Sequence, residues 1–261
     1  MRGALTYKKA RICMPYQMFF KRYELKYLIS DEQKEAILTA MNPYMIADKH
    51  GRSTIRNIYF DTDNYRLIRR SIEKPIYKEK LRIRSYSRSL PESTVFVELK
   101  KKYKNVVYKR RISMTEKDAM SWVCGARECT EATQISDEIE YFMRYYGDLR
   151  PSVFLSYDRE AFFSQDDVDF RVTFDNNILA RIHDLSLTAD VYGTPMLDAG
   201  NTLMEIKCSG GIPMWMVAVL SEERIFKTSF SKYGKAYQTM IFPDLFNKSD
   251  SVIMGDIPNV F

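Results

Sequence analysis

Apolar and polar residues alternate every second position along much of this chain, which is the periodicity of β-strands. The alternation begins in FFKRYELKYLI at residues 19–29 and resumes in TIRNIYFD at residues 54–61. Further strands are predicted at about 78–87, 94–103, 105–113, 151–162, 168–175, 178–187 and 201–208. The segment KKYKN predicts a hairpin turn, and the absence of regular crossover helices favours antiparallel pairing.

Apolar residues at helical spacing are confined to short segments between these strands. Ser30 begins one such helix, because Gln33 stands three residues later, as in a capping box. The other predicted helices are a short one capped by Thr115 and ending near Gly125, one over about 133–146 that stops at Gly147, one from Pro213 to about Glu223, and SKYGKAYQTM capped by Ser231.

This order of elements predicts an α+β protein built on one antiparallel sheet of about eight strands. A sheet with one highly charged face must turn that face to water or close around a wet interior. The opposite face, with Leu81, Ile83, Val172 and Ile206, is expected to pack against the helices. The chain shows no internal repeat or interdomain linker. We therefore predict a single domain over residues 18–246, an N-terminal extension over 1–17 and a C-terminal tail over 247–261.

Positive charge is concentrated in one part of the sequence. Residues 66–111 contain 16 Lys or Arg and four Asp or Glu, a balance of +12, whereas the whole chain carries only +6. In KLRIRSY the basic residues Lys80, Arg82 and Arg84 fall two apart, so all three point to the same face of a strand. Several neighbouring strands with such faces predict a surface that holds a phosphate-rich polyanion. The alternative is a solvated outer face.

Other features of the sequence narrow the class of protein. The four cysteines, with no CxxC spacing, are interpreted as free thiols of a reducing compartment, with a Cys124–Cys129 disulfide as the alternative. No apolar run reaches the roughly 18 residues of a transmembrane helix, and no signal peptide is evident. We expect a cytoplasmic protein that reaches a membrane only through a separate membrane protein. There is no P-loop, His-based zinc pattern, GxSxG elbow or RNP motif, and we expect no nucleic acid partner.

Acidic residues on the cationic strands suggest a second kind of chemistry. Glu205 shares a strand face with Lys207, and a carboxylate among phosphate-binding cations suits a divalent metal that bridges to phosphate oxygen. We favour metal binding for Glu205 and salt bridges for Glu24 and Glu98. At the last helix, the N–H groups beside the cap are a weaker candidate anion site. Its residues are Ser231, Lys232 and Lys235.

Eight sequence blocks in order resemble the polyphosphate polymerase domain of the vacuolar transporter chaperone (VTC) family in its short bacterial form. They are FKRYELKYLI, YFDT, EKLRIRSY, VFVELKKKYKNVVYKRRI, YDREAF, FRVTFD, LMEIK and SFSKYGKAY, and they cover about residues 18–240. That family belongs to the triphosphate tunnel superfamily. The resemblance implies an eight-stranded antiparallel β-barrel with flanking α-helices and a charged, water-filled interior.

The resemblance also implies an activity: transfer of the γ-phosphate of ATP to a growing inorganic polyphosphate chain. The residues that match catalytic tunnel cations are Lys26, Arg82, Arg84, Lys100, Lys109, Arg159 and Arg171. The residues we expect to bind substrate or product are Lys80, Arg111, Lys207, Ser231, Lys232 and Lys235. Glu205 matches the glutamate that binds Mn²⁺ or Mg²⁺, and Lys232 matches a lysine near the tunnel end. The expected small-molecule partners are ATP, polyphosphate, and orthophosphate or pyrophosphate.

Two positions depart from the family pattern. Hydrolytic relatives open with E-x-E-x-K, whereas this chain has Arg22, Glu24 and Lys26, and the missing first glutamate favours transfer over hydrolysis. Eukaryotic polymerases carry a second lysine where this chain has Ser229. The alternatives that stay open are a tunnel-type triphosphatase that hydrolyses ATP or inorganic triphosphate, and a module that binds polyphosphate or nucleotides without turnover.

Overall fold

One large antiparallel sheet dominates the computed structural model, which describes residues 23–104, 106–167 and 169–245. Its eight long strands are β1 (Tyr23–Ser30), β3 (Ser53–Asp61), β4 (Tyr77–Ser85), β5 (Thr94–Tyr103), β6 (Val106–Thr115), β7 (Arg150–Ser164), β8 (Arg171–Arg181) and β10 (Asn201–Cys208). Three short strands complete it: β2 (Met45–Ala47), β9 (Thr194–Pro195) and β11 (Lys227–Thr228). The predicted extension 1–17 and tail 247–261 lie outside the described residues.

Six α-helices connect or flank these strands. They are α1 (Asp31–Met41), α2 (Arg66–Ile72), α3 (Glu116–Val123), α4 (Gln134–Tyr146), α5 (Met214–Glu222) and α6 (Lys232–Ala236), and α6 continues into the π-helical turn η1 (Tyr237–Ile241). The expected capping box is present at Ser30, whose side chain accepts the Gln33 N–H while the Gln33 side chain accepts the Ser30 N–H. These helices confirm the α+β class.

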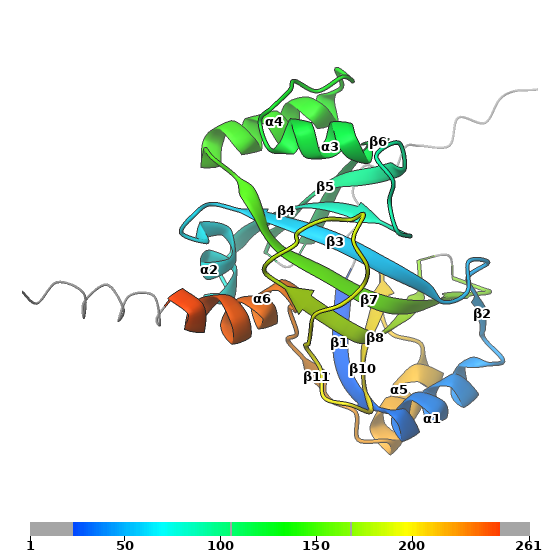
Figure 1. Ribbon diagram of the computed structural model, residues 1–261. Helices are drawn as coiled ribbons and strands as arrows, with labels where there is room; N and C mark the ends of the chain where they lie inside the picture. The colour runs from blue at the N-terminus through cyan, green and yellow to red at the C-terminus, as the bar shows by residue number, and fades with distance from the viewer. Residues whose placement is uncertain (1–22, 105, 168, 246–261) are drawn as a thin grey trace, which may run out of the picture.

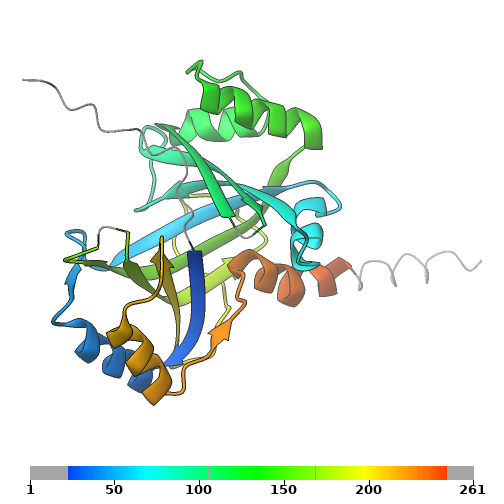
Figure 2. The same cartoon turned by 180° about the vertical axis from the view of Figure 1, so that it is seen from behind.

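The sheet follows the order β11-β1-β10-β8-β7-β3-β4-β5-β6, and each pair of neighbouring strands along it is antiparallel. It curls strongly, so that β1 and β5 approach one another although they are far apart in this order (Figures 1 and 2). The ladder within the described residues ends at β6 on one side and β11 on the other. The expected closed barrel is therefore a curled sheet with an open seam.

The outer face of the sheet packs against the helices at two places, as expected. Leu81 and Ile83 belong to a buried cluster beneath α3 and α4, which also contains Trp122. Val172 and Ile206 belong to a second cluster beneath α1 and α5. Figure 2 shows α1 and α5 side by side at one end of the molecule and the α3–α4 pair at the other. The charged inner faces lie between these two helical layers.

Some predicted boundaries were wrong. The predicted strands at 168–175 and 178–187 are one continuous strand, β8, which ends at Arg181. Helix α2 was missed, because no residue adjacent to it provides a side-chain cap. Its N–H groups at Leu67 and Ile68 instead donate to Asp61, at 2.8 and 3.0 Å. Loop residues therefore separate the helix from the side chain that stabilises its start.

Two further expectations concern cysteines and membranes. Cys124, Cys129 and Cys208 are free thiols, so the alternative disulfide between Cys124 and Cys129 is not formed. Among the described residues, no helix combines the length and apolar character that crossing a bilayer requires.

Candidate functional site

Charged side chains from seven strands and from α6 meet inside the curled sheet. We call this set the interior network. Its cations are Lys26, Lys80, Arg82, Arg84, Lys100, Lys109, Arg111, Arg159, Lys207 and Lys232, and its carboxylates are Glu24, Glu98, Asp175 and Glu205. Strand register explains the convergence, because Lys80 pairs with Lys100 and Lys100 with Lys109 across β4, β5 and β6. Ten cations therefore surround four carboxylates.

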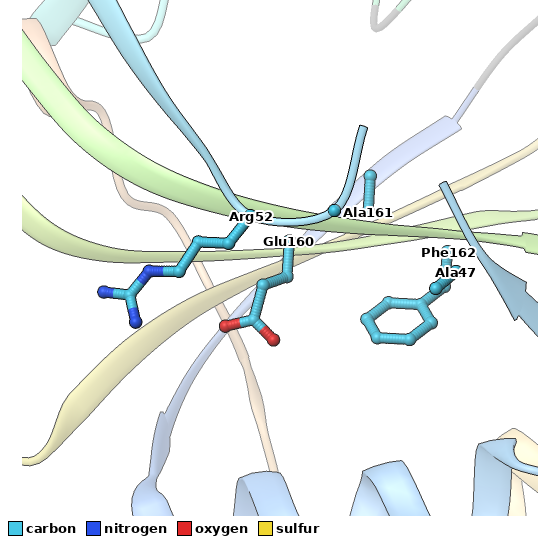
Figure 3. A pocket seen from close by; sticks show the side chains of 6 residues that line it. Ala47, Arg52, Glu160, Ala161 and Phe162 are labelled. Atoms are coloured by element: carbon cyan, nitrogen blue, oxygen red, sulfur yellow. The ribbon is translucent and has the colours of Figure 1, made fainter. Parts of the chain in front are cut away.

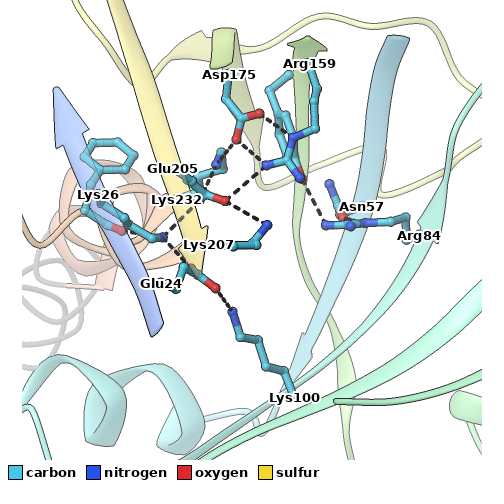
Figure 4. A network of polar contacts seen from close by, with 12 residues as sticks. Glu24, Lys26, Asn57, Arg84, Lys100, Arg159, Asp175, Glu205, Lys207 and Lys232 are labelled. Carbon is cyan, nitrogen blue, oxygen red and sulfur yellow. Dashed lines mark hydrogen bonds and ion pairs between the residues drawn. The ribbon is translucent and has the colours of Figure 1, made fainter. Parts of the chain in front are cut away.

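Glu205 lies at the centre of one half of this network (Figure 4). Its carboxylate oxygens are 3.2 Å from Lys26 Nζ, 3.3 Å from Arg159 Nη2, 3.5 Å from Lys232 Nζ and 3.7 Å from Lys207 Nζ. Burial disfavours the ionised form, but the fields of Lys26, Lys232, Lys207 and Arg159 outweigh burial and hold the pKa of Glu205 well below its usual range. Glu205 is thus a carboxylate that is ionised at neutral pH and shared by four cations.

Asp175 is a second centre that the sequence analysis did not include. It is fully buried and accepts two hydrogen bonds from Arg159, at 2.5 and 2.6 Å, and one from Lys232 Nζ at 2.6 Å. Burial alone would raise its pKa, but Lys232 and Arg159 lower it. The bidentate pair fixes the plane of the Arg159 guanidinium, and the Lys232 ammonium lies 4.4 Å from the centre of the Tyr157 ring.

Glu98 organises the other half of the network. It is 1% exposed and accepts hydrogen bonds from Arg82 at 2.8 and 2.9 Å and from Arg111 Nε at 2.7 Å. Lys109 Nζ lies 2.7 Å and Arg84 Nε 3.9 Å from its oxygens. Burial opposes ionisation, yet the surrounding cations lower the pKa of Glu98 far below its usual range. Glu98 therefore has the salt-bridge geometry expected of it.

Glu24 connects the two ends of the curled sheet. Its carboxylate is 3.0 Å from Lys100 on β5 and 3.5 Å from Lys26 on its own strand, β1. Despite burial, Lys100 and Lys26 lower the pKa of Glu24. The Glu24–Lys100 pair is an ion pair, as expected, and it joins strands that no ladder connects directly (Figure 4).

Lys80 differs from the other interior lysines in having a hydroxyl as its recorded partner. Its Nζ donates to Ser231 Oγ at 2.9 Å. Burial, reinforced by the charges of Lys26, Lys100 and Lys78, lowers the pKa of Lys80 to about 7. Lys80 is therefore the interior lysine that most readily takes up a proton, and so becomes charged, when an anion binds nearby.

Two other interior lysines also titrate below their ordinary range. Burial lowers the pKa of Lys207 to about 8, against the opposing field of Glu205. Burial likewise lowers the pKa of Lys109 to about 8, against the opposing field of Glu98. In both cases the fold desolvates the ammonium more than the nearest carboxylate compensates.

Polar residues that the charge pattern did not reveal position the interior arginines. Arg84 Nε donates to Asn57 Oδ1 and its Nη2 to the Tyr157 hydroxyl, each at 2.9 Å. Arg82 Nη1 donates to the Tyr59 hydroxyl at 2.8 Å. The signal for Asn57 and Tyr59 was their spacing of two on a predicted strand, which places both side chains on the same face of β3.

Thr173 is a further residue that the sequence analysis missed. It pairs with Glu205 in the β8–β10 register and is fully buried. Its hydroxyl has no hydrogen-bond partner among the described residues. An orphaned donor beside Glu205 fits a site that is completed by an additional oxygen ligand.

The lysine at the start of α6 is held by a buried anchor. Next to Lys232, the Tyr233 hydroxyl donates to Asp61 Oδ2 at 2.9 Å and lies 2.7 Å from Ser152 Oγ. The Tyr233 ring stacks on Tyr59, with centroids 5.1 Å apart. Asp61 also caps α2, so one carboxylate fixes both helices.

Two candidate residues lie outside these ion-pair centres. Lys235 is exposed, and no ion pair recorded among the described residues joins it to the network. Arg171 lies near one end of the interior, 3.6 Å from Asp48 and with its guanidinium over the Phe163 ring at 4.3 Å.

Ser231 Oγ accepts hydrogen bonds from both the Gly234 N–H and Lys80 Nζ, so its hydroxyl acts as a bridge between α6 and β4.

A divalent metal fits this site only together with phosphate. The described residues contain no group of three or more His, Cys, Asp or Glu side chains arranged to hold an ion. Glu205 offers carboxylate oxygens next to the orphaned Thr173 hydroxyl, and Mg²⁺ is commonly held by one or two carboxylates plus substrate phosphates. A metal held by Glu205 would therefore need its remaining ligands from bound phosphate and water.

A separate pocket of about 310 Å³ lies where β2 meets β7, outside the interior network (Figure 3). Its charged lining residues are Arg52 and Glu160. Each is already paired, Arg52 with Asp158 and Glu160 with Lys34, both at 2.9 Å. The pocket thus offers less for an anionic ligand than the interior does.

Comparisons with a protein family and with solved structures agree with the fold described above. The VTC domain family model matches residues 21–241. No curated protein matches the chain. Among solved structures, a Bacillus halodurans protein described as a "putative adenylate cyclase" has a TM-score of 0.52 and 15% identity, covering 84% of this chain and 99% of that one. This likeness shows the fold, which is the triphosphate tunnel fold.

Two other solved structures are more distant. A Vibrio parahaemolyticus protein with the same description has a TM-score of 0.45 and 12% identity, covering 82% of this chain and 96% of that one. PH1819 from Pyrococcus horikoshii has a TM-score of 0.37 and 12% identity, covering 78% and 86%.

Proposed function

The chain belongs to the VTC domain family, and from this we propose that it is an ATP-dependent polyphosphate polymerase. The observation that carries the proposal is the composition of the interior network. Ten cations converge on a space in which every carboxylate is already paired with a cation. Such an interior attracts phosphate chains more strongly than it attracts neutral or cationic molecules.

Phosphoryl transfer to a phosphate chain requires little covalent chemistry from the protein. The attacking phosphate oxygen is already ionised, so no general base is required, and catalysis consists of positioning and charge stabilisation. The fixed guanidinium planes of Arg82, Arg84 and Arg159 suit bidentate contacts to phosphate oxygens. Lys26 and Lys232, which flank Glu205, would neutralise charge on the transferred group.

Glu205 is the proposed ligand of Mn²⁺ or Mg²⁺, with Thr173 beside it. When bound, the metal would offset negative charge on the phosphates. The four cations around Glu205 do not oppose this role once phosphate enters, because the incoming oxygens provide those cations with new partners.

The two halves of the network suggest a division of labour. The Glu205–Asp175 half contains the proposed metal ligand, and we assign the donor triphosphate to it. Lys80 and its register partner Lys100 lie on the β4–β5 side, where they would hold the accepting chain. In this arrangement polyphosphate and ATP occupy one continuous cationic path. Transport of the product across a membrane would need a separate membrane protein, which stays a prediction.

Incubation of the purified protein with ATP, Mn²⁺ and a short polyphosphate primer tests the proposal, with products resolved on a gel. A ladder of long polyphosphate together with ADP is expected. ADP with orthophosphate and no ladder would instead identify a triphosphatase. Tight polyphosphate binding without turnover would identify a binding module. Added salt should weaken binding in every case, because polyanion association releases counterions.

A further inference from the structure

An exposed face outside the interior combines basic and aromatic side chains. It is formed by α2, the loop that leads from α2 into β4, the adjoining ends of β4 and β5, and the C-terminal end of α4 (Figure 1). We call it the basic aromatic face and define it by Arg66, Arg69, Arg70, Lys74, Ile76 and Tyr103. Neither the family match nor the proposed activity assigns a role to this face.

Contacts between the loop and the β-hairpin make the face continuous. The Lys104 N–H donates to the Ile76 carbonyl at 3.0 Å, so the loop before β4 is fixed to the end of β5. Tyr77 pairs with Tyr103 in the β4–β5 register. This hydrogen bond and this register pairing bring one aliphatic and two aromatic side chains together at the same edge.

Helix α4 joins the same surface through tyrosines. The Arg66 guanidinium lies over the rings of Tyr145 and Tyr146, 5.8 and 5.4 Å from their centres. The Tyr146 hydroxyl donates to Glu79 at 2.8 Å, and the Tyr77 hydroxyl donates to the other oxygen of Glu79 at 2.5 Å. One buried carboxylate therefore ties α4 to the start of β4 beneath this face.

Three large side chains with apolar surface are exposed on this face. Ile76 is 67% exposed, Tyr145 56% and Tyr103 45%. The cations Arg66, Arg69, Arg70 and Lys74 are also exposed, whereas the carboxylate of Glu79 is buried and Glu73 is the exposed acid of this segment. Aliphatic and tyrosine side chains surrounded by Arg and Lys are the composition found where proteins meet an anionic bilayer.

We propose that the basic aromatic face binds the surface of an anionic lipid bilayer directly, in place of the expected attachment through a separate membrane protein. Ile76 and Tyr103 would enter the headgroup region, since tyrosine places its ring among apolar groups and its hydroxyl at the water interface. The four cations would pair with lipid phosphates above and around them. A bilayer surface supplies both an apolar region for Ile76 and Tyr103 and anionic headgroups for the four cations, and an acidic protein partner is the alternative that absence of vesicle binding would leave.

Vesicle co-sedimentation of the full-length protein tests this proposal. The probes are vesicles of phosphatidylcholine alone and of phosphatidylcholine mixed with phosphatidylglycerol, at physiological ionic strength. We expect binding to the mixed vesicles only. The charge variant Arg69→Gln/Arg70→Gln/Lys74→Gln should reduce the partition coefficient about tenfold or more. The apolar variant Ile76→Ser/Tyr103→Ser should also reduce it, by roughly tenfold, through lost apolar burial.

Matched controls separate this face from net charge and general hydrophobicity. Lys49→Gln/Lys117→Gln/Arg127→Gln removes three exposed cations elsewhere, and Leu90→Ser/Phe226→Ser removes two exposed apolar side chains elsewhere. Both controls should bind like the wild type, and all variants should keep its thermal midpoint. Absence of binding to mixed vesicles would overturn the proposal, as would equal losses in test and control variants. Retained binding in the apolar variant would show that the lipid surface is not entered and would also overturn it.

Discussion

Lys80 donates from Nζ to Ser231 Oγ at 2.9 Å, and this bond joins the charged face of β4 to the beginning of α6. The hydroxyl supplies an acceptor but no negative charge, so burial and the neighbouring cations lower the pKa of Lys80 to about 7. Cationic neighbours face it from three strands: Lys26 on β1, Lys78 and Arg82 on β4, and Lys100 on β5. Lys80 is therefore poised to take up a proton when a phosphate chain enters.

Binding of tripolyphosphate should consequently weaken as pH rises above about 7 in the wild type. The sign follows from the charge: Lys80 binds the anion as an ammonium, and the free protein loses that proton as pH passes through the lowered pKa. Lys80→Arg should remain charged and lose this part of the pH dependence, while Lys80→Gln should bind more weakly at pH 6.5 and differ least from wild type at high pH. Calorimetry in buffers of different ionisation enthalpy measures the proton uptake directly. Equal pH profiles for wild type and Lys80→Arg would contradict the assignment.

Replacing the proposed metal ligand should separate turnover from binding. Glu205→Gln keeps the shape of the side chain but removes a charge that Lys26, Arg159, Lys207 and Lys232 share. Turnover should fall by roughly 100-fold or more, because metal-assisted charge stabilisation is lost. Polyphosphate binding should persist or strengthen, since the interior becomes more cationic. Steady-state turnover and fluorescence binding measure the two quantities, and unchanged turnover would exclude the metal role.

Arg82 should contribute to substrate binding more than to the fold. Arg82→Ala leaves Glu98 with Lys109 and Arg111, so its carboxylate stays paired. We expect ATP affinity to fall by about 10- to 100-fold, the loss of one bidentate phosphate contact. The thermal midpoint should change little. Arg84→Ala is the informative comparison, because Arg84 is more buried and is fixed by Asn57 and Tyr157. A large drop in the midpoint of Arg82→Ala would make that residue structural.

Acid should destabilise the protein through its paired carboxylates. Burial raises and neighbouring cations lower the pKa of Glu98, Glu205 and Glu24, and the cations prevail in each case. A depressed pKa in the folded state gives stability that is present above the unfolded value of 4.5 and is lost as pH falls below it. Urea denaturation between pH 7 and 3 should show this decline. Its slope should be smaller in Glu98→Gln, and an identical slope would argue against the contribution of Glu98.

The hydrogen bonds of the Tyr233 hydroxyl should contribute measurably to the free energy of unfolding. Tyr233→Phe removes a hydrogen bond to the buried Asp61 and the contact with Ser152. We expect a loss of about 1–3 kcal/mol in the free energy of unfolding, the cost of leaving buried polar groups unsatisfied. Urea denaturation measures it. Tyr141→Phe, at an exposed tyrosine, should change stability by less than about 0.5 kcal/mol.

Strand periodicity predicted most of the sheet because most of the long strands alternate charged or polar residues on one face with apolar residues on the other. It also placed Lys80, Arg82 and Arg84 on the same inner face, which is a direct consequence of spacing by two. The missed helix α2 shows the limit of this approach, since its cap, Asp61, reaches it from the end of β3 and not from the residue before it. Asp61 stands six residues before Leu67, outside the spacing of a capping box, so the pattern used to find helix starts does not detect it.

The candidate site was predicted less completely than the sheet. Charge spacing identified the cations, but Asp175 was overlooked because its importance depends on Arg159 and Lys232, which come from other elements. The neutral residues Asn57 and Thr173 were missed because polar residues are common on strands and only burial distinguishes these two. The open seam between β6 and β11 could not be predicted either. Alternation shows which side chains share a face of a strand, but it does not show which strands are neighbours in the sheet.

The register of the inner strands has a consequence for the life of the protein in a cell. Lys78 faces Lys102 and Lys80 faces Lys100, so like charges oppose one another across β4 and β5. Under the proposed function, a phosphate chain in the interior would relieve that repulsion and, by mass action, would stabilise the folded chain. Resistance to proteolysis should therefore rise and fall with the supply of phosphate polymer, and the amount of this protein would then be governed in part by the compound it handles.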